Sequence, residues 1–161
     1  MNNRQISIVI SFAFAGYISL VCFNNITDYG SNFSFVQHVT GMDGVFSKEK
    51  TGWRAVDQPY LHHLFYISLI IIEVCTAIAL WTGSIQMTRH YQSAPDVFKN
   101  AKKWVNTGMT LGFLLFFGGF IGIAGEWFLM WQQSEWNAQG TAFSLSLIFL
   151  GGLIFLNQHD S

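Results

Sequence analysis

Long apolar stretches separated by polar segments dominate the pattern of this chain. A helix of about 20 apolar residues, rising about 1.5 Å per residue, crosses a bilayer core of roughly 30 Å. Four nearly charge-free stretches meet this requirement: 5–27, 58–88, 104–134 and 136–159. The pattern therefore predicts four transmembrane helices, at about 6–26, 58–87, 94–131 and 141–156.

Two prolines mark where the second and third predicted helices begin. Proline fits the first turn of a helix because its missing N–H needs no partner there. Pro59 and Pro95 stand at the two expected starts. Asp57 and Ser93, just before them, are the side chains that we expect to cap these helices.

The longest polar segment, 27–57, separates the first two helices. It opens on a turn-rich run of small and polar residues, 27–32. Apolar and polar positions then recur at helical spacing, at Phe33, Val36, Gln37 and Thr40. We therefore expect a short interfacial helix in this segment, capped by Ser31 or Asn32.

Composition agrees with a membrane protein and excludes several functions. Only 11% of the 161 residues are charged and 51% are hydrophobic, whereas a soluble domain carries about 25% charged residues. We expect a single domain, residues 1–161, that is an all-α integral membrane protein with four transmembrane helices in an antiparallel bundle. A net charge of -1 without a basic block predicts no nucleic-acid partner. Motifs such as HExxH and GxSxG do not occur, so we expect no enzyme.

The distribution of Lys and Arg predicts the orientation in a bacterial inner membrane. Cytoplasmic segments are richer in these residues than periplasmic ones. One side of the predicted bundle holds Arg4, Arg89, Lys99, Lys102 and Lys103. The other side holds Lys48, Lys50 and Arg54. We therefore expect both termini in the cytoplasm, and the segment 27–57 and the loop 132–140 in the periplasm.

An acidic residue, Glu73, lies about 14 residues into the second predicted helix, near the bilayer midplane. At about 100° per residue, it shares one helix face with four other residues. The stripe consists of His62, Tyr66, Leu69, Glu73 and Thr76. It is either part of a proton or ion path or ligand cleft, or a packing face in which a protonated Glu73 bonds to a neighbouring helix.

A second acidic residue, Glu126, lies near the outer end of the third predicted helix. On an α-helix it shares a face with four glycines: Gly108, Gly112, Gly119 and Gly122. Small residues let helices approach closely. We interpret this face as a packing surface that ends in a buried polar group. Alternatively, Glu126 closes a polar cluster with the outer histidines or with Asn24 and Asn25.

The histidines are candidate ligands of a metal ion or haem, and the two cysteines are candidates for a disulfide. No His lies inside an apolar helix, which argues against haem held within the bundle. His38 with His62 or His63 could form a weak zinc or copper site with Asp28 or Glu126. Because interfacial His caps are commoner than metal sites, we expect no metal and no cofactor. Cys22 and Cys75 lie at different depths, so we expect free thiols.

Two groups of residues resemble a known bacterial family. The first group comprises 25–33, 35–39, 42–43, 53–55 and 61–63, and the second comprises 125–132 and 135–137. They resemble the predicted small integral membrane proteins known as domain of unknown function 2165. In that family a serine tends to follow the glutamine directly, whereas Gln133 intervenes here before Ser134, so we assign the serine no role. The resemblance implies a four-helix inner-membrane protein of Gram-negative bacteria, with no reaction or cofactor to carry over.

The absence of a reaction motif favours a protein that binds partners. We expect contacts with membrane lipid. We also expect binding of another membrane or periplasmic protein through the periplasmic cap and the outer-leaflet helix faces, either as an accessory subunit or as an immunity-type protein against a membrane-acting toxin. The candidate binding residues are Asn25, Asp28, Tyr29, Asn32, His38, Trp53, Arg54, His62, His63, Glu126, Trp127, Trp136 and Asn137. Two alternatives remain open: a small proton or ion channel or carrier that uses Glu73 and Glu126, and a metal- or haem-binding membrane subunit.

Overall fold

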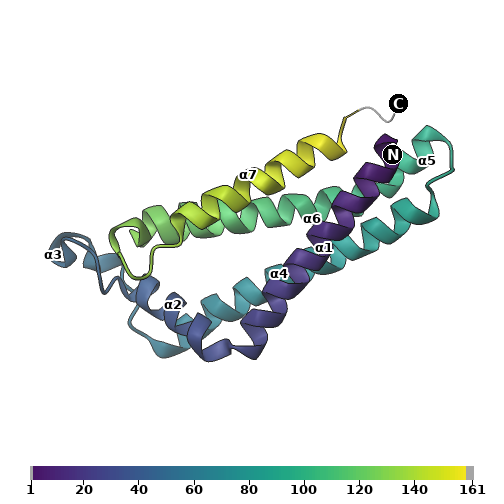
Figure 1. Ribbon diagram of the computed structural model, residues 1–161. Coiled ribbons are helices and arrows are strands. Elements are labelled where there is room, and N and C mark those ends of the chain that lie inside the picture. Colours follow the sequence, from purple (N-terminus) through teal and green to yellow (C-terminus); the bar gives the residue numbers. More distant parts are fainter. Residues whose placement is uncertain (1, 159–161) are drawn as a thin grey trace.

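Four long helical segments run alternately up and down in the computed structural model, which describes residues 2–158 (Figure 1). They are α1 (Asn3–Thr27), α4 (Pro59–Arg89), α6 (Lys103–Phe113) with its continuation η2 (Leu114–Trp127), and α7 (Gln139–Leu156). A short helix, α5 (Pro95–Ala101), precedes α6. Four spans, at Asn3–Thr27, Pro59–Arg89, Pro95–Trp127 and Gln139–Leu156, are long and apolar enough to cross a membrane. The predicted all-α membrane fold is confirmed.

The helix starts differ in detail from the expected caps. Pro59 and Pro95 do occupy the first turns of α4 and α5. The cap positions, however, are Gln58 and Ala94, and neither side chain bonds to the helix. The expected caps Asp57 and Ser93 are therefore wrong, because each residue lies one position too early. At the start of α1, Asn2 and Gln5 form a reciprocal capping box.

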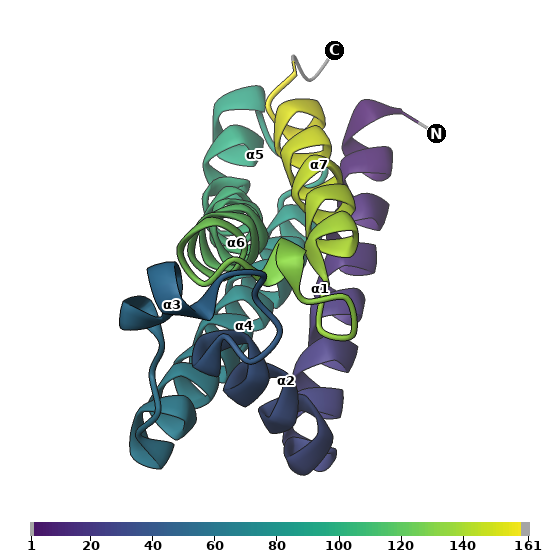
Figure 2. The same cartoon turned by 90° about the vertical axis from the view of Figure 1, so that its left-hand side faces the viewer.

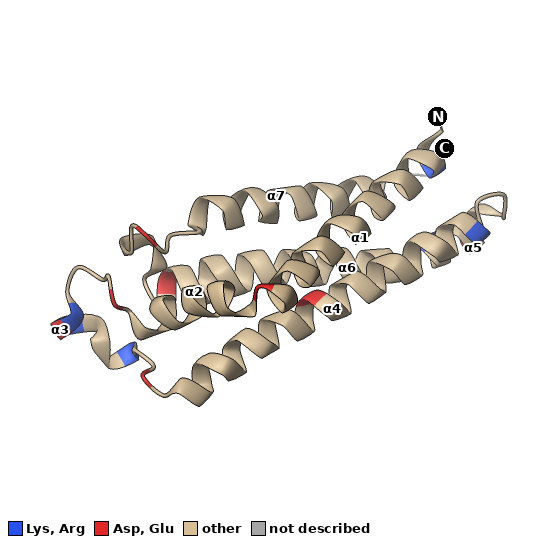
Figure 3. Cartoon of the chain, turned by 60° about the horizontal axis from the view of Figure 1, so that its bottom comes forward, with Lys and Arg blue, Asp and Glu red and all other residues tan. Residues whose placement is uncertain are grey.

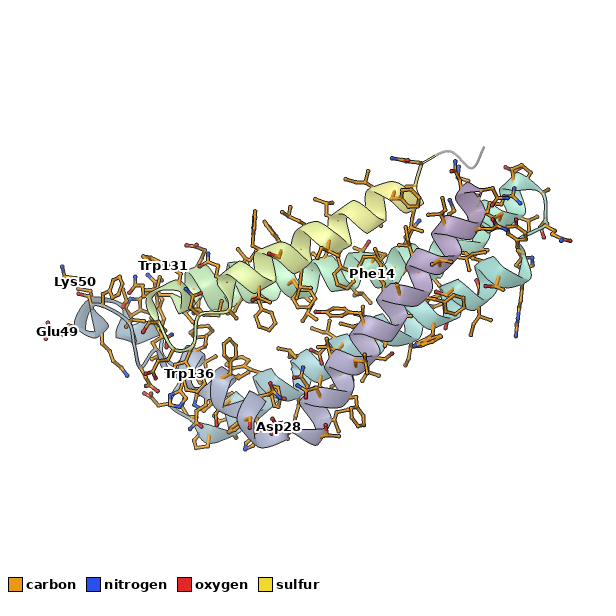
Figure 4. All side chains as sticks on the ribbon, viewed as in Figure 1. Phe14, Asp28, Glu49, Lys50, Trp131 and Trp136 are labelled. Atoms are coloured by element: carbon orange, nitrogen blue, oxygen red, sulfur yellow. The ribbon has the colours of Figure 1, made fainter. Side chains whose placement is uncertain are left out.

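Helix α4 lies in the middle of the bundle, with α1 on one side and α6 on the other. Glycines permit this close approach, since a Cβ at Gly83 would collide with the Val105 backbone and one at Gly108 with Leu80. Helix α7 packs mainly on α6 and η2; Figure 2 shows α6 and α7 side by side. Phe14 reaches from α1 toward α7, where its ring centroid lies 4.9 Å from that of Phe149 (Figure 4).

The third membrane segment changes from an α-helix to a π-helix halfway along. Segment η2 (Leu114–Trp127) has π-helical geometry, which places one extra residue between hydrogen-bonded partners. Its end is marked by a bond from the Phe128 N–H to the Ile123 carbonyl at 3.0 Å. The third helix, predicted to run to about residue 131, ends earlier, at Trp127, and Leu129 beyond it takes a left-handed conformation.

The glycine face predicted for this segment is divided by the change in helix type. Gly108 and Gly112 are buried against Leu80 and Phe149, respectively. Gly119 has open space where a side chain would be, and Gly122 meets only the carbonyl of Phe117 in its own segment. A spacing of about 100° per residue holds only for an α-helix, so the predicted face does not extend into η2.

The polar segments fold into a cap at one end of the bundle. We define the cap as residues 28–58 and 128–138; it contains α2 (Tyr29–Gly41), α3 (Lys48–Thr51), η1 (Gly52–Arg54) and η3 (Met130–Gln132). The short helix expected near Phe33 is present as α2, but it begins at Tyr29 rather than after Ser31 or Asn32. Buried residues of the cap form a hydrophobic core of their own around Val39, Met42, Phe128 and Met130.

The charged residues are concentrated at the two ends of the bundle. Both ends of the described chain lie with α5 at the end opposite the cap (Figure 1). Lys, Arg, Asp and Glu gather at the two ends, while the long helices are uncharged for most of their length (Figure 3). The distribution is the one expected for a bundle whose middle lies in hydrocarbon.

Candidate functional site

Two segments far apart in sequence are joined within the cap. The backbone N–H of Phe46 donates to Gln132 Oε1 at 3.0 Å. Gln133 Nε2 donates to the Val39 carbonyl at 3.3 Å, and the side chain is 1% exposed. The sequence does not single out Gln133 as a buried residue. Its neighbours in the loop are also polar, and the loop has no periodic pattern that would separate buried from exposed positions. This glutamine ties the loop after η2 to the end of α2.

The cap contains both non-glycine residues with positive φ in the described part of the chain. Met42 has φ 55° at the end of α2, and Leu129 has φ 53° after η2. Such conformations cost about 1–3 kcal/mol each and persist only where the surroundings enforce them. Met42 is fully buried in the cap core. The chain therefore holds one defined turn inside the cap, after α2, and another where it enters the cap from η2.

His38 fastens the turn after α2 rather than facing an open site. Its Nδ1 lies 2.8 Å from Asp43 Oδ2, and its ring stacks on Trp136 with centroids 4.4 Å apart. Figure 4 places Trp136 beside α2. Lys48 Nζ lies 3.5 Å from the other oxygen of Asp43. These exposed groups connect α2, the following loop and the segment before α7.

Arg54 lies between two exposed tryptophans at the edge of the cap. Its guanidinium carbon is 5.4 Å from the ring centroid of Trp53 and 5.5 Å from that of Trp127. Arg54 Nη1 also donates to the Trp127 carbonyl at 3.3 Å. The structure thus brings together three of the predicted binding residues in one aromatic and cationic cluster at the end of η2.

His62 and His63 face different neighbours, as their adjacent positions on a helix require. His62 is buried, with its Nδ1 2.7 Å from Thr40 Oγ1. The Thr40 hydroxyl also lies within hydrogen-bond distance of the Val36 carbonyl, at 2.7 Å. His63 Nδ1 lies 2.8 Å from Tyr29 Oη. Both histidines therefore fasten α2 to α4.

Glu73 is buried opposite the last turn of α1. Its Oε1 accepts a hydrogen bond from Asn25 Nδ2 at 2.7 Å, and Tyr66 Oη donates to the Asn25 carbonyl at 2.8 Å. The carboxyl is 2% exposed, and Oε2 has no hydrogen-bond partner among residues 2–158. Counting along α4 alone places Glu73 at mid-membrane, but Asn25 shows that it lies level with the end of α1 at Thr27.

The predicted stripe on α4 is a packing face in this structure. Its four polar members, His62, Tyr66, Glu73 and Thr76, are all buried. Tyr66 and Glu73 both bond to Asn25 of α1, which links these two members of the stripe. His62 bonds to Thr40 of α2, and Thr76 donates to the Ile72 carbonyl of its own helix at 2.7 Å. Among the described residues, no hydrogen bond joins the Tyr66–Asn25–Glu73 group to His62 or Thr76.

Glu126 does not take the buried position that either interpretation gave it. Its side chain is exposed at the end of η2, where it forms no hydrogen bond or ion pair with residues 2–158. The neighbouring Gly125 is buried instead. The π-helical turn shifts the register, so the carboxylate points away from the bundle. Glu73 and Glu126 are therefore not brought together.

The remaining candidate residues are exposed in the cap or support its turns. Asp28 lies at the turn between α1 and α2 (Figure 4), and Asn32 Nδ2 donates to its carbonyl at 3.0 Å. Asn137 Oδ1 accepts a hydrogen bond from the Gln139 N–H at 3.0 Å at the start of α7.

The two cysteines, Cys22 and Cys75, are free thiols. No group of three or more potential metal ligands occurs within the described residues.

An apolar groove lies directly beneath the cap, between α2, α4 and η2. It has a volume of about 250 Å³. Its walls include Val36 and Val39 of α2, Leu69 and Ile72 of α4, and Gly119 and Phe120 of η2. Val39 also belongs to the cap core. We call this feature the cap groove.

Comparison with known proteins identifies the family to which the chain belongs. A family described as predicted small integral membrane protein (DUF2165) matches residues 3–159. No curated protein and no solved structure matches the chain. Since the match spans nearly the whole sequence and the fold has four potential membrane-spanning helices, the chain belongs to the DUF2165 family of predicted small integral membrane proteins.

Proposed function

We propose that this chain is a non-enzymatic protein of the inner membrane of Gram-negative bacteria that binds a transmembrane helix of another protein. The helix occupies the cap groove, and the cap contacts the partner where it leaves the membrane. Both termini lie in the cytoplasm and the cap faces the periplasm, in agreement with the larger number of Lys and Arg residues at the end opposite the cap.

The cap groove is the observation that carries this proposal. Its wall is almost entirely apolar, and it is open on one side rather than enclosed. At Gly119, a Cβ atom would meet no other atom within 4 Å. A glycine with open space beside it lets a second helix approach closely, which is how small residues promote helix association in membranes. A partner helix therefore fits better than a polar ligand.

Charged and aromatic groups at the rim of the groove support recognition of a protein. Glu126 is exposed in η2, two residues after Ala124 and two before Phe128, which both line the groove. Arg54, held between Trp53 and Trp127, lies at the same end of η2. Aromatic side chains and arginine are enriched where partners bind. A basic residue just outside the partner's membrane segment would complement Glu126.

Two biological versions of this function share the same surface. An accessory subunit would bind a helix of a larger membrane complex, and an immunity-type protein would bind a toxin that acts at the membrane. Both versions require a partner in fixed ratio to this chain. The identity of that partner distinguishes them.

A substitution that fills the groove tests the proposal. Gly119→Leu adds a side chain at a position that lines the groove and where a Cβ atom meets no atom within 4 Å. Gly118→Leu is the matched control, because Gly118 also has open space, lies in the same π-helix and does not line the groove. The chain is purified from membranes in mild detergents, and the ratio of any bound protein is measured.

The expected result is a stoichiometric partner with the original chain and with Gly118→Leu, and at least a tenfold lower yield with Gly119→Leu. Recovery of the chain alone in every detergent would overturn the proposal. Equal recovery with both variants would also overturn it, since binding would then not use the cap groove.

A further inference from the structure

We infer that the end of the bundle opposite the cap binds the headgroup of an anionic phospholipid. The site is a groove between α5, α6 and the end of α7, which we call the lysine groove. It is separate from the cap groove and shares no residue with it. The inference therefore does not depend on the proposed function.

The lysine groove forms because α7 ends before its neighbour does. Helix α7 stops at Leu156, while α6 continues into α5. The uncovered face has a cavity of about 920 Å³ that extends from Pro95 to Leu111. The groove thus spans α5 and most of α6. A cavity of this volume accommodates a lipid headgroup together with the upper part of an acyl chain.

Positive charge is concentrated at one end of the groove. Lys99, Lys102 and Lys103 line it, against a single acidic lining residue, Asp96. Lys99 and Lys103 are exposed. Lys102 is 4% exposed, and its Nζ donates to the Leu156 carbonyl at 2.8 Å. It offsets the negative end of the α7 dipole, which would otherwise repel an anion from the groove.

Polar groups below the lysines extend the site toward the membrane. Asn106 Nδ2 and Asn157 Oδ1, 3.0 Å apart, join α6 to the end of α7 within the groove. Thr107 and Thr110 follow on the same face of α6, and the groove then ends at Leu111. Along the groove, the lining therefore changes from cationic through polar to apolar. A phospholipid has its groups in the matching order: the anionic headgroup, the polar glycerol region and the apolar acyl chains.

An exposed tryptophan places the lysines at the membrane surface. Trp104 is 46% exposed in the first turn of α6, immediately after Lys103. Tryptophans concentrate at the level of the lipid headgroups. Basic pockets between transmembrane helices at this depth bind anionic headgroups. A phosphodiester that is anchored by its acyl chain in the adjacent bilayer therefore fits the groove better than a soluble anion.

Spin-labelled lipids provide a direct test. The full chain is reconstituted in phosphatidylcholine vesicles that contain a trace of spin-labelled phosphatidylglycerol or phosphatidylcholine. The motionally restricted fraction of each label is then measured by electron paramagnetic resonance. We expect phosphatidylglycerol to be preferred, and Lys99→Gln combined with Lys103→Gln to reduce that preference by about fivefold for each lysine.

Two controls separate this site from general electrostatic attraction. Lys48→Gln with Lys50→Gln removes the same charge from α3 in the cap (Figure 4) and should retain the preference. Lys99→Arg with Lys103→Arg should retain it as well. No preference in the original chain, or an equal loss with the cap variant, would overturn the inference. Competition by soluble glycerol phosphate would overturn the lipid assignment in favour of a free anion.

Discussion

Individual polar side chains in this protein mainly hold helices together. His62 and His63 connect α4 with α2, and Gln133 connects the cap loop with α2. Glu73 is the deepest example, because it bonds to Asn25 of α1 and is shielded from solvent. A carboxyl in a membrane helix suggests a transport path by its residue type alone, but its contacts here are those of a packing group.

Substitutions of Glu73 distinguish packing from transport. Glu73→Gln keeps an oxygen acceptor for Asn25 Nδ2, so its free energy of unfolding should stay closer to the original value than that of Glu73→Leu. Glu73→Leu removes the acceptor and should lower the free energy of unfolding by about 0.6–1.7 kcal/mol, the usual range for hydrogen bonds between membrane helices. Unfolding in mixed detergent micelles measures both values.

The same variants give a functional comparison. Liposomes that contain the original chain or Glu73→Gln should show the same proton permeability as empty liposomes. A flux that Glu73→Gln abolishes would contradict the packing role. Such a flux would support the channel or carrier that the α4 stripe suggested.

The most informative element is the third membrane segment, where α6 gives way to the π-helix η2. Its α-helical half packs tightly through Gly108 against Leu80. Its π-helical half instead lines the cap groove and leaves Gly119 open. π-Helical turns are frequent at functional sites, and here the transition separates a structural half from the half proposed to bind a partner.

Alanine substitutions should reveal this division within one segment. A Cβ atom at Gly108 would overlap the Leu80 side chain and approach its backbone nitrogen, so Gly108→Ala should destabilise the protein by about 1–3 kcal/mol. Gly118→Ala meets open space and should be neutral or stabilising. The free energy of unfolding in detergent checks both. Equal destabilisation would show that the two halves pack alike.

At the scale of the whole molecule, the two ends of the bundle differ in structure. One end carries the folded cap with its own core, and the other carries both ends of the described chain together with α5. The cap groove and the lysine groove lie at opposite ends. Orientation in the membrane therefore decides on which side of the bilayer the cap contacts the partner.

Cysteine labelling tests the proposed orientation. Glu49, in the exposed α3 at the tip of the cap (Figure 4), and Gln92, between α4 and α5, are both exposed. A membrane-impermeant maleimide added to intact spheroplasts should label Glu49→Cys and leave Gln92→Cys unlabelled until the membrane is disrupted. Labelling of Gln92→Cys alone in intact spheroplasts would show that the chain has the opposite orientation and would contradict the proposal.

The sequence by itself determined the four membrane-spanning helices, because an apolar stretch of sufficient length is a local property of the chain. It also predicted the short helix in the segment after α1 and the close packing at Gly108 and Gly112. These features depend on residues a few positions apart. Tertiary structure was not needed to recognise them.

Only the tertiary structure decided which of these surfaces meet. Gln133 is buried because it meets Val39, 94 residues away, and no local pattern encodes that contact. Glu126 points outward because η2 is π-helical, which a periodicity of 3.6 residues per turn does not anticipate. The cap groove and the lysine groove exist because helices of different lengths and types end at different levels. Such cavities are properties of the packing between segments.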